Sequence, residues 1–289
     1  MRKNWPIFFL LILFTSCSME IELNQPAYQS KVVVDGFIES NGFAHVFLTK
    51  SSPFLTKYDS ASIRESFLNT ASVKLICSNG DSEILTLFRQ NTFFPPFIYK
   101  SIRMKGISGE TYSLEIRSQG KVITASTSIP AMPNLTSFYM ASKSDSSGVL
   151  QVTVSSDSNK LSYLFIQYRS QLDDQNFHPA GIPVYKLESS PPIFTLNVYR
   201  CDESNLTLLK SKKSPYSDWP KNYFSKKDTV FVKMGLVDAT SYQVLKSLFS
   251  DLTMRNNPFA FNSEGIQSNI VGGIGRWTGI GMAALQVYP

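Results

Sequence analysis

The chain has 289 residues, of which 43% are hydrophobic and 13% aromatic, and its formal net charge is +6. This length suggests two domains of ordinary size, and the apolar fraction is ample for packed cores. No dense Lys/Arg run with interleaved aromatic residues occurs, so a nucleic-acid partner is not expected. The prominence of 21 Phe and 13 Tyr, with few Ala- or Leu-rich helical windows, favours a mainly β fold.

The N-terminus has the pattern of a secretory signal peptide, which we assign to residues 1–16. Basic Arg2 and Lys3 precede an apolar run over residues 7–14. That run is far shorter than the roughly 20 apolar residues that a transmembrane helix needs. Removal of the leader leaves 26 Lys and Arg against 22 Asp and Glu, a formal charge of +4.

The small residues Thr15 and Ser16 stand directly before Cys17, as in the bacterial lipobox. In that motif the cysteine thiol is diacylated, the leader is cleaved before it, and several acyl chains together give stable anchoring. We therefore predict that Cys17 is lipidated and ties the mature protein to an outer membrane, with residues 17–30 as a tether. An ordinary secretory leader with a chance cysteine is the alternative.

Residues 31–130 predict an immunoglobulin-like β-sandwich. Seven short strand-like runs, separated by turn signals, match the strand count of that fold. They cover residues 31–39, 44–50, 72–78, 83–89, 97–103, 111–117 and 121–128. In the sixth run Tyr112, Leu114 and Ile116 alternate with polar residues, which predicts that one face is packed.

Pro130 and Pro133 mark the best domain boundary, because two prolines in four residues interrupt both ladders and helices. Residues 134–289 predict a second β-rich domain with one short helix. Its strands are expected at 149–154, 161–169, 192–200 and 228–234, and residues 170–180 are expected to be a surface loop. The helix is indicated by the stripe Tyr242, Leu245, Leu248 and Phe249, with Asp238 or Thr240 as its cap. The tail from 256 to 289 predicts tight turns that join a few final strands.

Exposed aromatic residues in long loops are the candidate contacts for a partner or ligand. The segment from Ser52 to Thr70 is longer than a hairpin needs, and loops of that length are often functional. The alternative is a loop that only covers the end of the sandwich. The candidates in this segment and in the tail are Phe54, Tyr58, Phe259, Phe261 and Trp277.

The sequence assigns no catalytic, cofactor-binding or metal-binding residue. Only His45 and His178 are available as histidine bases, and an ordinary surface or edge histidine is the favoured interpretation of His45. The serine-hydrolase, zinc-hydrolase and P-loop motifs are missing from the sequence. Residues 173–176 offer oxygen atoms to calcium but match no EF-hand spacing, and the glycines at 272–275 lack the helix that a phosphate loop requires.

Two further chemistries stay open at this point. A glycosidase needs only two carboxylates, and 22 acidic residues are present. Cys77 and Cys201 could form a disulfide in an oxidising compartment. Cys77 continues the apolar alternation of Val73 and Leu75, which favours a buried free thiol.

Several segments together resemble a family of Bacteroidetes outer-membrane lipoproteins known as domain of unknown function 4249. They are Val32–Ile38, Val46–Phe54, Gly109–Leu114, Ala125–Pro130, Asn257–Phe261 and Ser268–Gly275. Their order and spacing carry the resemblance, which covers nearly the whole mature chain. The family has no agreed catalytic residues, so none is transferred.

The resemblance implies a lipoprotein associated with a TonB-dependent outer-membrane transporter for nutrient capture. We predict a non-enzymatic accessory or ligand-capture subunit without a cofactor. A surface hydrolase of glycan or peptide and a structural or adhesion lipoprotein are the alternatives. Acidic residues after the lipidated cysteine are associated in the family with surface export. In this sequence Glu20 and Glu22 follow Cys17 but are separated by apolar residues. We expect the cell surface, with the periplasmic face as the alternative.

Overall fold

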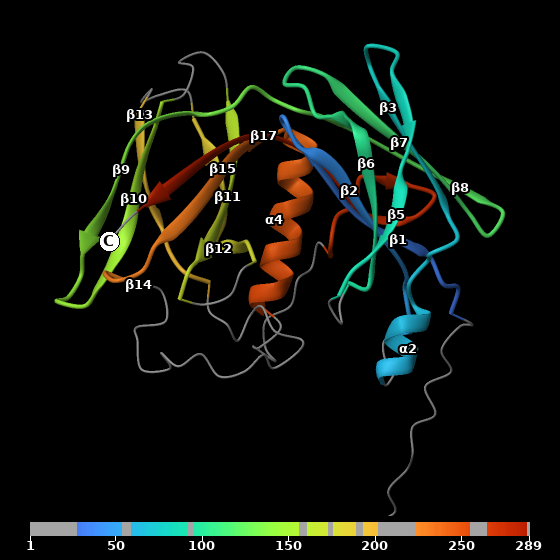
Figure 1. Cartoon of the computed structure of the whole chain (residues 1–289), viewed down its shortest axis with the longest axis horizontal. Coiled ribbons are helices and arrows are strands. Elements are labelled where there is room, and N and C mark those ends of the chain that lie inside the picture. Colours follow the sequence, from blue (N-terminus) through green and yellow to red (C-terminus); the bar gives the residue numbers. More distant parts are fainter. Residues whose placement is uncertain are drawn as a thin grey trace, which may run out of the picture.

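The computed structural model describes residues 28–53, 59–91, 95–155, 161–172, 176–188, 193–201, 223–254 and 265–287. Within these ranges it contains seventeen strands and two helices, so the predicted mainly β fold is confirmed (Figure 1). Because Cys17 and residues 1–27 lie outside the described part, the leader and the lipid anchor stay predictions.

One eight-stranded sheet, the large sheet, runs through the molecule in the order β12-β11-β15-β17-β1-β2-β6-β5. In that order the strands span His178–Leu187, Ser162–Ser170, Val230–Val237, Ile274–Val287, Val32–Glu39, Phe43–Lys50, Phe97–Lys105 and Thr86–Arg89. The C-terminal strand β17 pairs in parallel with β1 and antiparallel with β15. The large sheet therefore joins the two halves of the chain.

Two smaller sheets pack on the large sheet. The five-stranded sheet has the order β16-β8-β7-β3-β4, with bounds Ile270–Val271, Lys121–Ser128, Thr111–Ser118, Ser72–Cys77 and Ser82–Ile84. The four-stranded sheet contains β13 (Ile193–Val198), β10 (Ser147–Ser155), β14 (Phe224–Ser225) and β9 (Asn134–Ser142). Each encloses its own cluster of buried side chains against the large sheet.

Both small sheets cover the same face of the large sheet. Along β17, Trp277 packs in the core of the five-stranded sheet, and Gly281, four residues later on the same face, pairs with Leu236 of β15. Leu236 packs against the core of the four-stranded sheet. Two sandwiches therefore share one continuous sheet.

The long helix α4 (Ala239–Met254) covers the opposite face. Alternation along β11 decides this, because Leu164 and Ile166 belong to the core of the four-stranded sheet while Phe165 packs with Tyr242 and Leu245 of the helix. The helix begins where the sequence predicts, since the Ser241 N–H donates to Asp238 Oδ1 at 2.7 Å.

Strand prediction is most accurate in the N-terminal half, where the observed bounds differ from the expected ones by only a few residues. One predicted strand, residues 83–89, is divided at Leu85 into β4 and β5. Leu85 is buried and its N–H donates to the Val73 carbonyl, so the chain crosses there from the five-stranded to the large sheet. The five-stranded sheet and the large sheet do form a sandwich, but its immunoglobulin-like topology stays a prediction.

Four segments differ from expectation. Residues 134–142, where no strand was expected, form β9. The long segment 52–70 contains the short helix α2 (Ser60–Glu65), which Asp59 caps. The loop expected to end at residue 180 ends earlier, because β12 begins at His178. The tail contains a fourteen-residue strand, β17, at the centre of the large sheet. The domain boundary predicted at residues 130–133 divides the sequence into two parts, but the large sheet contains strands from both parts.

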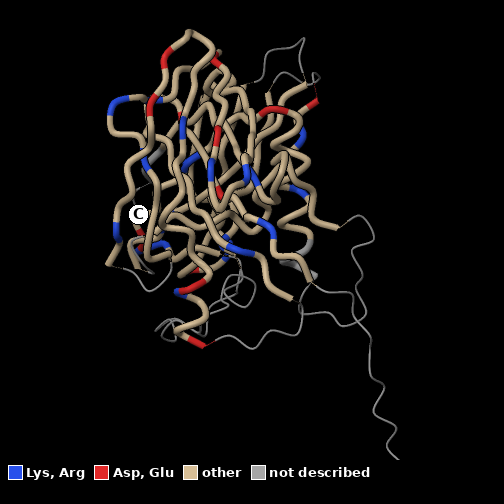
Figure 2. Tube along the Cα trace, turned by 90° about the vertical axis from the view of Figure 1, so that its right-hand side faces the viewer, with Lys and Arg blue, Asp and Glu red and all other residues tan. Residues whose placement is uncertain are grey.

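Charged side chains are spread over the molecule rather than gathered at one place. Figure 2 shows Lys and Arg interspersed with Asp and Glu along the trace. Cys77 is buried at 3% exposure and no disulfide joins it to Cys201, which agrees with the predicted buried thiol. Within the described ranges no helix is long and apolar enough to span a bilayer.

Candidate functional site

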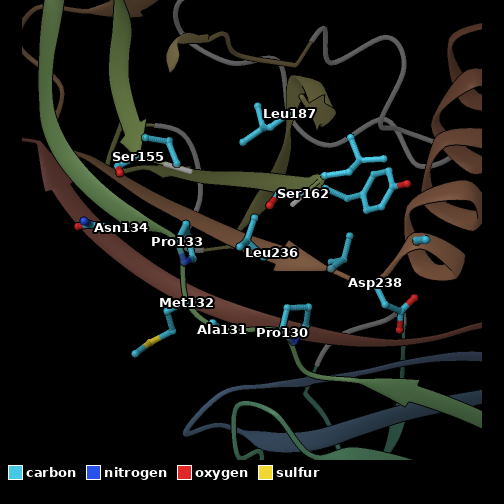
Figure 3. A pocket seen from close by; sticks show the side chains of 15 residues that line it. Pro130, Ala131, Met132, Pro133, Asn134, Ser155, Ser162, Leu187, Leu236 and Asp238 are labelled. Carbon is cyan, nitrogen blue, oxygen red and sulfur yellow. The ribbon is translucent and has the colours of Figure 1, made fainter. Parts of the chain in front are cut away.

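The strongest candidate site is a hollow of about 760 Å³ at the junction of the two halves. Its walls are the linker 130–133, the ends of β10 and β15, the starts of β9, β11 and α4, and Leu187 of β12. Apart from the linker, all of these elements belong to the C-terminal half, and Figure 3 shows side chains of the linker, β11 and β15 around the hollow. The volume lies in the range of small-molecule sites, about 300–1,000 Å³.

The linker forms one wall because it lies directly on the backbone of β17. A Cβ atom added at Gly281 would be 2.2 Å from the Pro130 carbonyl oxygen and 2.6 Å from that of Ala131. Only glycine permits this approach, which holds the linker against the large sheet.

The lining is mainly apolar. Leu187 is buried, and Leu236 and Pro133 complete the inner wall (Figure 3). Met132 and Leu161 are 52% and 46% exposed, so they give the hollow an apolar rim. A mainly apolar pocket with few polar groups suits an apolar ligand or peptide side chain.

Asp238 is the only acidic side chain among the described lining residues. Its Oδ1 accepts the Ser241 N–H, and its Oδ2 accepts the Thr127 hydroxyl at 2.9 Å and the Ser128 N–H at 3.2 Å. The carboxylate is therefore occupied as a helix cap and as a link to β8. A two-carboxylate hydrolysis would require a second acid that these lining residues do not provide.

The other buried carboxylates hold the chain in a similar way. Glu83 accepts the N–H groups of Ile102, Arg103 and Met104. Burial opposes ionisation of Glu83, but these three backbone donors outweigh it and lower its pKa. Asp228 accepts the hydroxyl of Ser170, so it is also a structural anchor.

The two histidines do not form a pair. His45 lies on β2 and His178 on β12, five strand positions apart in the large sheet, which corresponds to about 24 Å. His45 stacks on Phe37 with ring centroids 5.0 Å apart, and its Nδ1 lies 2.9 Å from the Phe43 carbonyl. Burial is the main cause that lowers the pKa of His45, so a structural role fits this half-buried ring.

Trp277 corrects one predicted contact. The side chain is fully buried, and its indole Nε1–H donates to the Tyr112 carbonyl at 2.8 Å. It is a core residue between β1 and the five-stranded sheet, so it cannot touch a partner. The sequence contains a signal that this prediction missed, since Gly275, Gly279 and Gly281 alternate with larger residues and share one strand face with Trp277, and such glycines mark close backbone approach.

The remaining predicted contacts, Phe54, Tyr58, Phe259 and Phe261, lie outside the described residues. So do three of the four residues considered as oxygen ligands for calcium, at 173–175. Within the described part, no group of three or more His, Cys, Asp or Glu side chains is arranged to hold a metal ion.

The sequence of residues 18–281 matches the family described as domain of unknown function DUF4249. The chain belongs to the DUF4249 family. This agrees with the resemblance seen in the motifs. No curated protein matches this chain.

Two solved structures align with this DUF4249 protein only loosely. A DUF4785 family protein from Legionella pneumophila has a TM-score of 0.24 and 15% identity, with 72% of this chain and 52% of that chain covered. This chain thus spans about half of that protein's length. Bovine butyrophilin has a TM-score of 0.18 and 7% identity, with 73% and 93% covered.

Proposed function

We propose that this DUF4249 protein is a non-enzymatic, lipid-anchored outer-membrane subunit that captures an apolar ligand or peptide side chain in the hollow at the linker 130–133. It works as an accessory to a TonB-dependent nutrient transporter. The observation that carries the proposal is the hollow itself, with its apolar lining and its single, fully engaged carboxylate.

Three features support the parts of this proposal. The leader and Cys17 support export and anchoring. Membership of the family supports the transporter association through the resemblance described above. The apolar rim at Met132 and Leu161 supports capture, because exposed apolar residues beside a pocket favour ligand contact.

Binding at the hollow is tested with the fluorescent apolar probe N-phenyl-1-naphthylamine. Leu161→Arg places a charge on the rim, and we expect it to weaken probe binding about tenfold, equivalent to about 1.4 kcal/mol. The matched control is Val122→Arg on the five-stranded sheet, where the wild-type residue is 57% exposed. Equal probe affinity in all three proteins would remove the hollow as a binding site.

The transporter association is tested separately, by affinity capture of the lipidated protein after mild detergent extraction. We expect a TonB-dependent barrel protein in the captured material, identified by mass spectrometry. Isolation of the protein without a barrel would reject the accessory role and favour the adhesion alternative. Mass spectrometry of the mature N-terminus tests Cys17, and an unmodified cysteine would reject the anchor.

A further inference from the structure

Strand β9 (Asn134–Ser142) leaves one of its two edges open. Within the described chain its backbone pairs with β10, from Ser142 opposite Gly148 to Asn134 opposite Ser155, and with no other strand. An open edge presents a row of N–H and C=O groups that can accept another strand.

The other described sheet edges are short, interrupted or shielded. The edge strands β4, β5 and β16 have only two to four residues. β12 contains Pro179 and Pro183, which cannot donate to a ladder. β13 lies beside β12, where the Tyr185 hydroxyl donates to the Asn197 carbonyl and the Gly181 N–H to the Tyr199 carbonyl.

By contrast, β9 has few of the usual protections, and its ladder with β10 is interrupted only by a register shift at Thr136, near the start of the strand. Its nine residues include no charged residue and no proline. Phe138 and Tyr139 at its centre are 42% and 54% exposed. Phe138 lies opposite the fully buried Val152 in the ladder, so its side chain is on the core-facing side of the sheet. Much of the ring is nevertheless exposed to solvent at the edge. A long, uncharged edge with exposed aromatic residues is the kind that natural proteins avoid unless it is paired.

We propose that β9 pairs with β9 of a second copy of this chain and forms a homodimer. Pairing of one strand with itself about a two-fold axis places like residues near one another, so a charge near the middle would face its own copy. The sequence of β9 removes that repulsion over its whole length. The two four-stranded sheets would join into one, with Phe138 at the centre of the paired segment. This inference does not depend on the proposed function.

The test is the mass of the mature lipoprotein in mild detergent, measured by light scattering after size exclusion over a dilution series. We expect two chains per particle for the wild type. Phe138→Lys should give one chain per particle, because two ammonium groups would meet at the axis. The matched control is Ile193→Lys on β13, at the opposite edge of the same sheet, where the wild-type residue is 57% exposed. It should keep two chains.

Near-UV circular dichroism shows whether each variant keeps the native packing. If Phe138→Lys does not fold, Tyr139→Lys, at a more exposed position, makes the same test. A wild-type particle with one chain at every concentration overturns the proposal. So does a folded charge variant of β9 that keeps two chains.

Discussion

At the scale of single residues, Asp238 connects three parts of the molecule. Its carboxylate caps α4 through Ser241 and binds Thr127 and Ser128 at the end of β8. The Thr127 hydroxyl oxygen in turn accepts the Gly279 N–H of β17 at 2.8 Å. One side chain therefore fixes the helix, the five-stranded sheet and the central strand around the hollow.

We expect Asp238→Ala to lower the free energy of unfolding by about 2–3 kcal/mol, since it removes a helix cap and two further partners. Chemical denaturation followed by circular dichroism measures this. Asp59→Ala is the matched control, because Asp59 also caps a helix but stands at the surface before the short α2. An Asp238→Ala variant that loses no more stability than the control would show that these bonds contribute little.

At the scale of secondary structure, β17 is the element on which the large sheet depends. It provides parallel pairing to β1 from Val33–Ile274 to Glu39–Ile280 and antiparallel pairing to β15 beyond. Asp35 and Arg276 add an ion pair at 2.7 Å across the parallel ladder. The side chain of Trp277 then closes the core of the five-stranded sheet.

Gly275 makes this pairing possible, and we expect Gly275→Ala to cost about 2–5 kcal/mol of stability. Its φ is +118°, and an added Cβ would lie 1.9 Å from the Val34 carbonyl oxygen. Gly80→Ala is the control, since Gly80 also has a positive φ, +97°, but no heavy atom within 4 Å. The control should cost about 1–2 kcal/mol from backbone strain alone. Thermal unfolding compares the two, and equal losses would contradict the close contact.

At the scale of the whole molecule, the two sandwiches depend on one another. The N-terminal core contains Ile270 and Trp277, which come from the far end of the chain. The C-terminal half in turn pairs with β1 through β17. Neither half contains all the strands of the large sheet, so cooperative unfolding of both halves is expected.

A fragment of residues 18–133 should therefore fail to fold, because β1 would lose a neighbour and the core would lose Trp277. Limited proteolysis and near-UV circular dichroism measure this. Co-expression with residues 134–289 is the control and should restore a protease-resistant complex. A fragment that folds cooperatively without its partner would show that the N-terminal sandwich is independent.

The sequence by itself determined much of the local structure. Period-two alternation located the strands, for example around Tyr112 and Leu114, and the helical stripe with Asp238 located α4. These signals are local, because the buried face of a strand or an amphipathic helix appears as a regular spacing of apolar residues within a short stretch of sequence. The family was also recognisable from short motifs. No local signal, however, predicted which strands would pair in the sheets.

Only the tertiary structure decided the place of β17, the burial of Trp277 and the hollow at the linker. Asp35 and Arg276 are 241 residues apart in sequence but form an ion pair, and such pairing depends on the assembled sheet. The glycine alternation at 275, 279 and 281 places Trp277 on one face of a strand, but only its neighbours in the assembled sheets determine that this face is buried. The hollow exists because Gly281 brings the linker onto β17, a contact between segments about 150 residues apart.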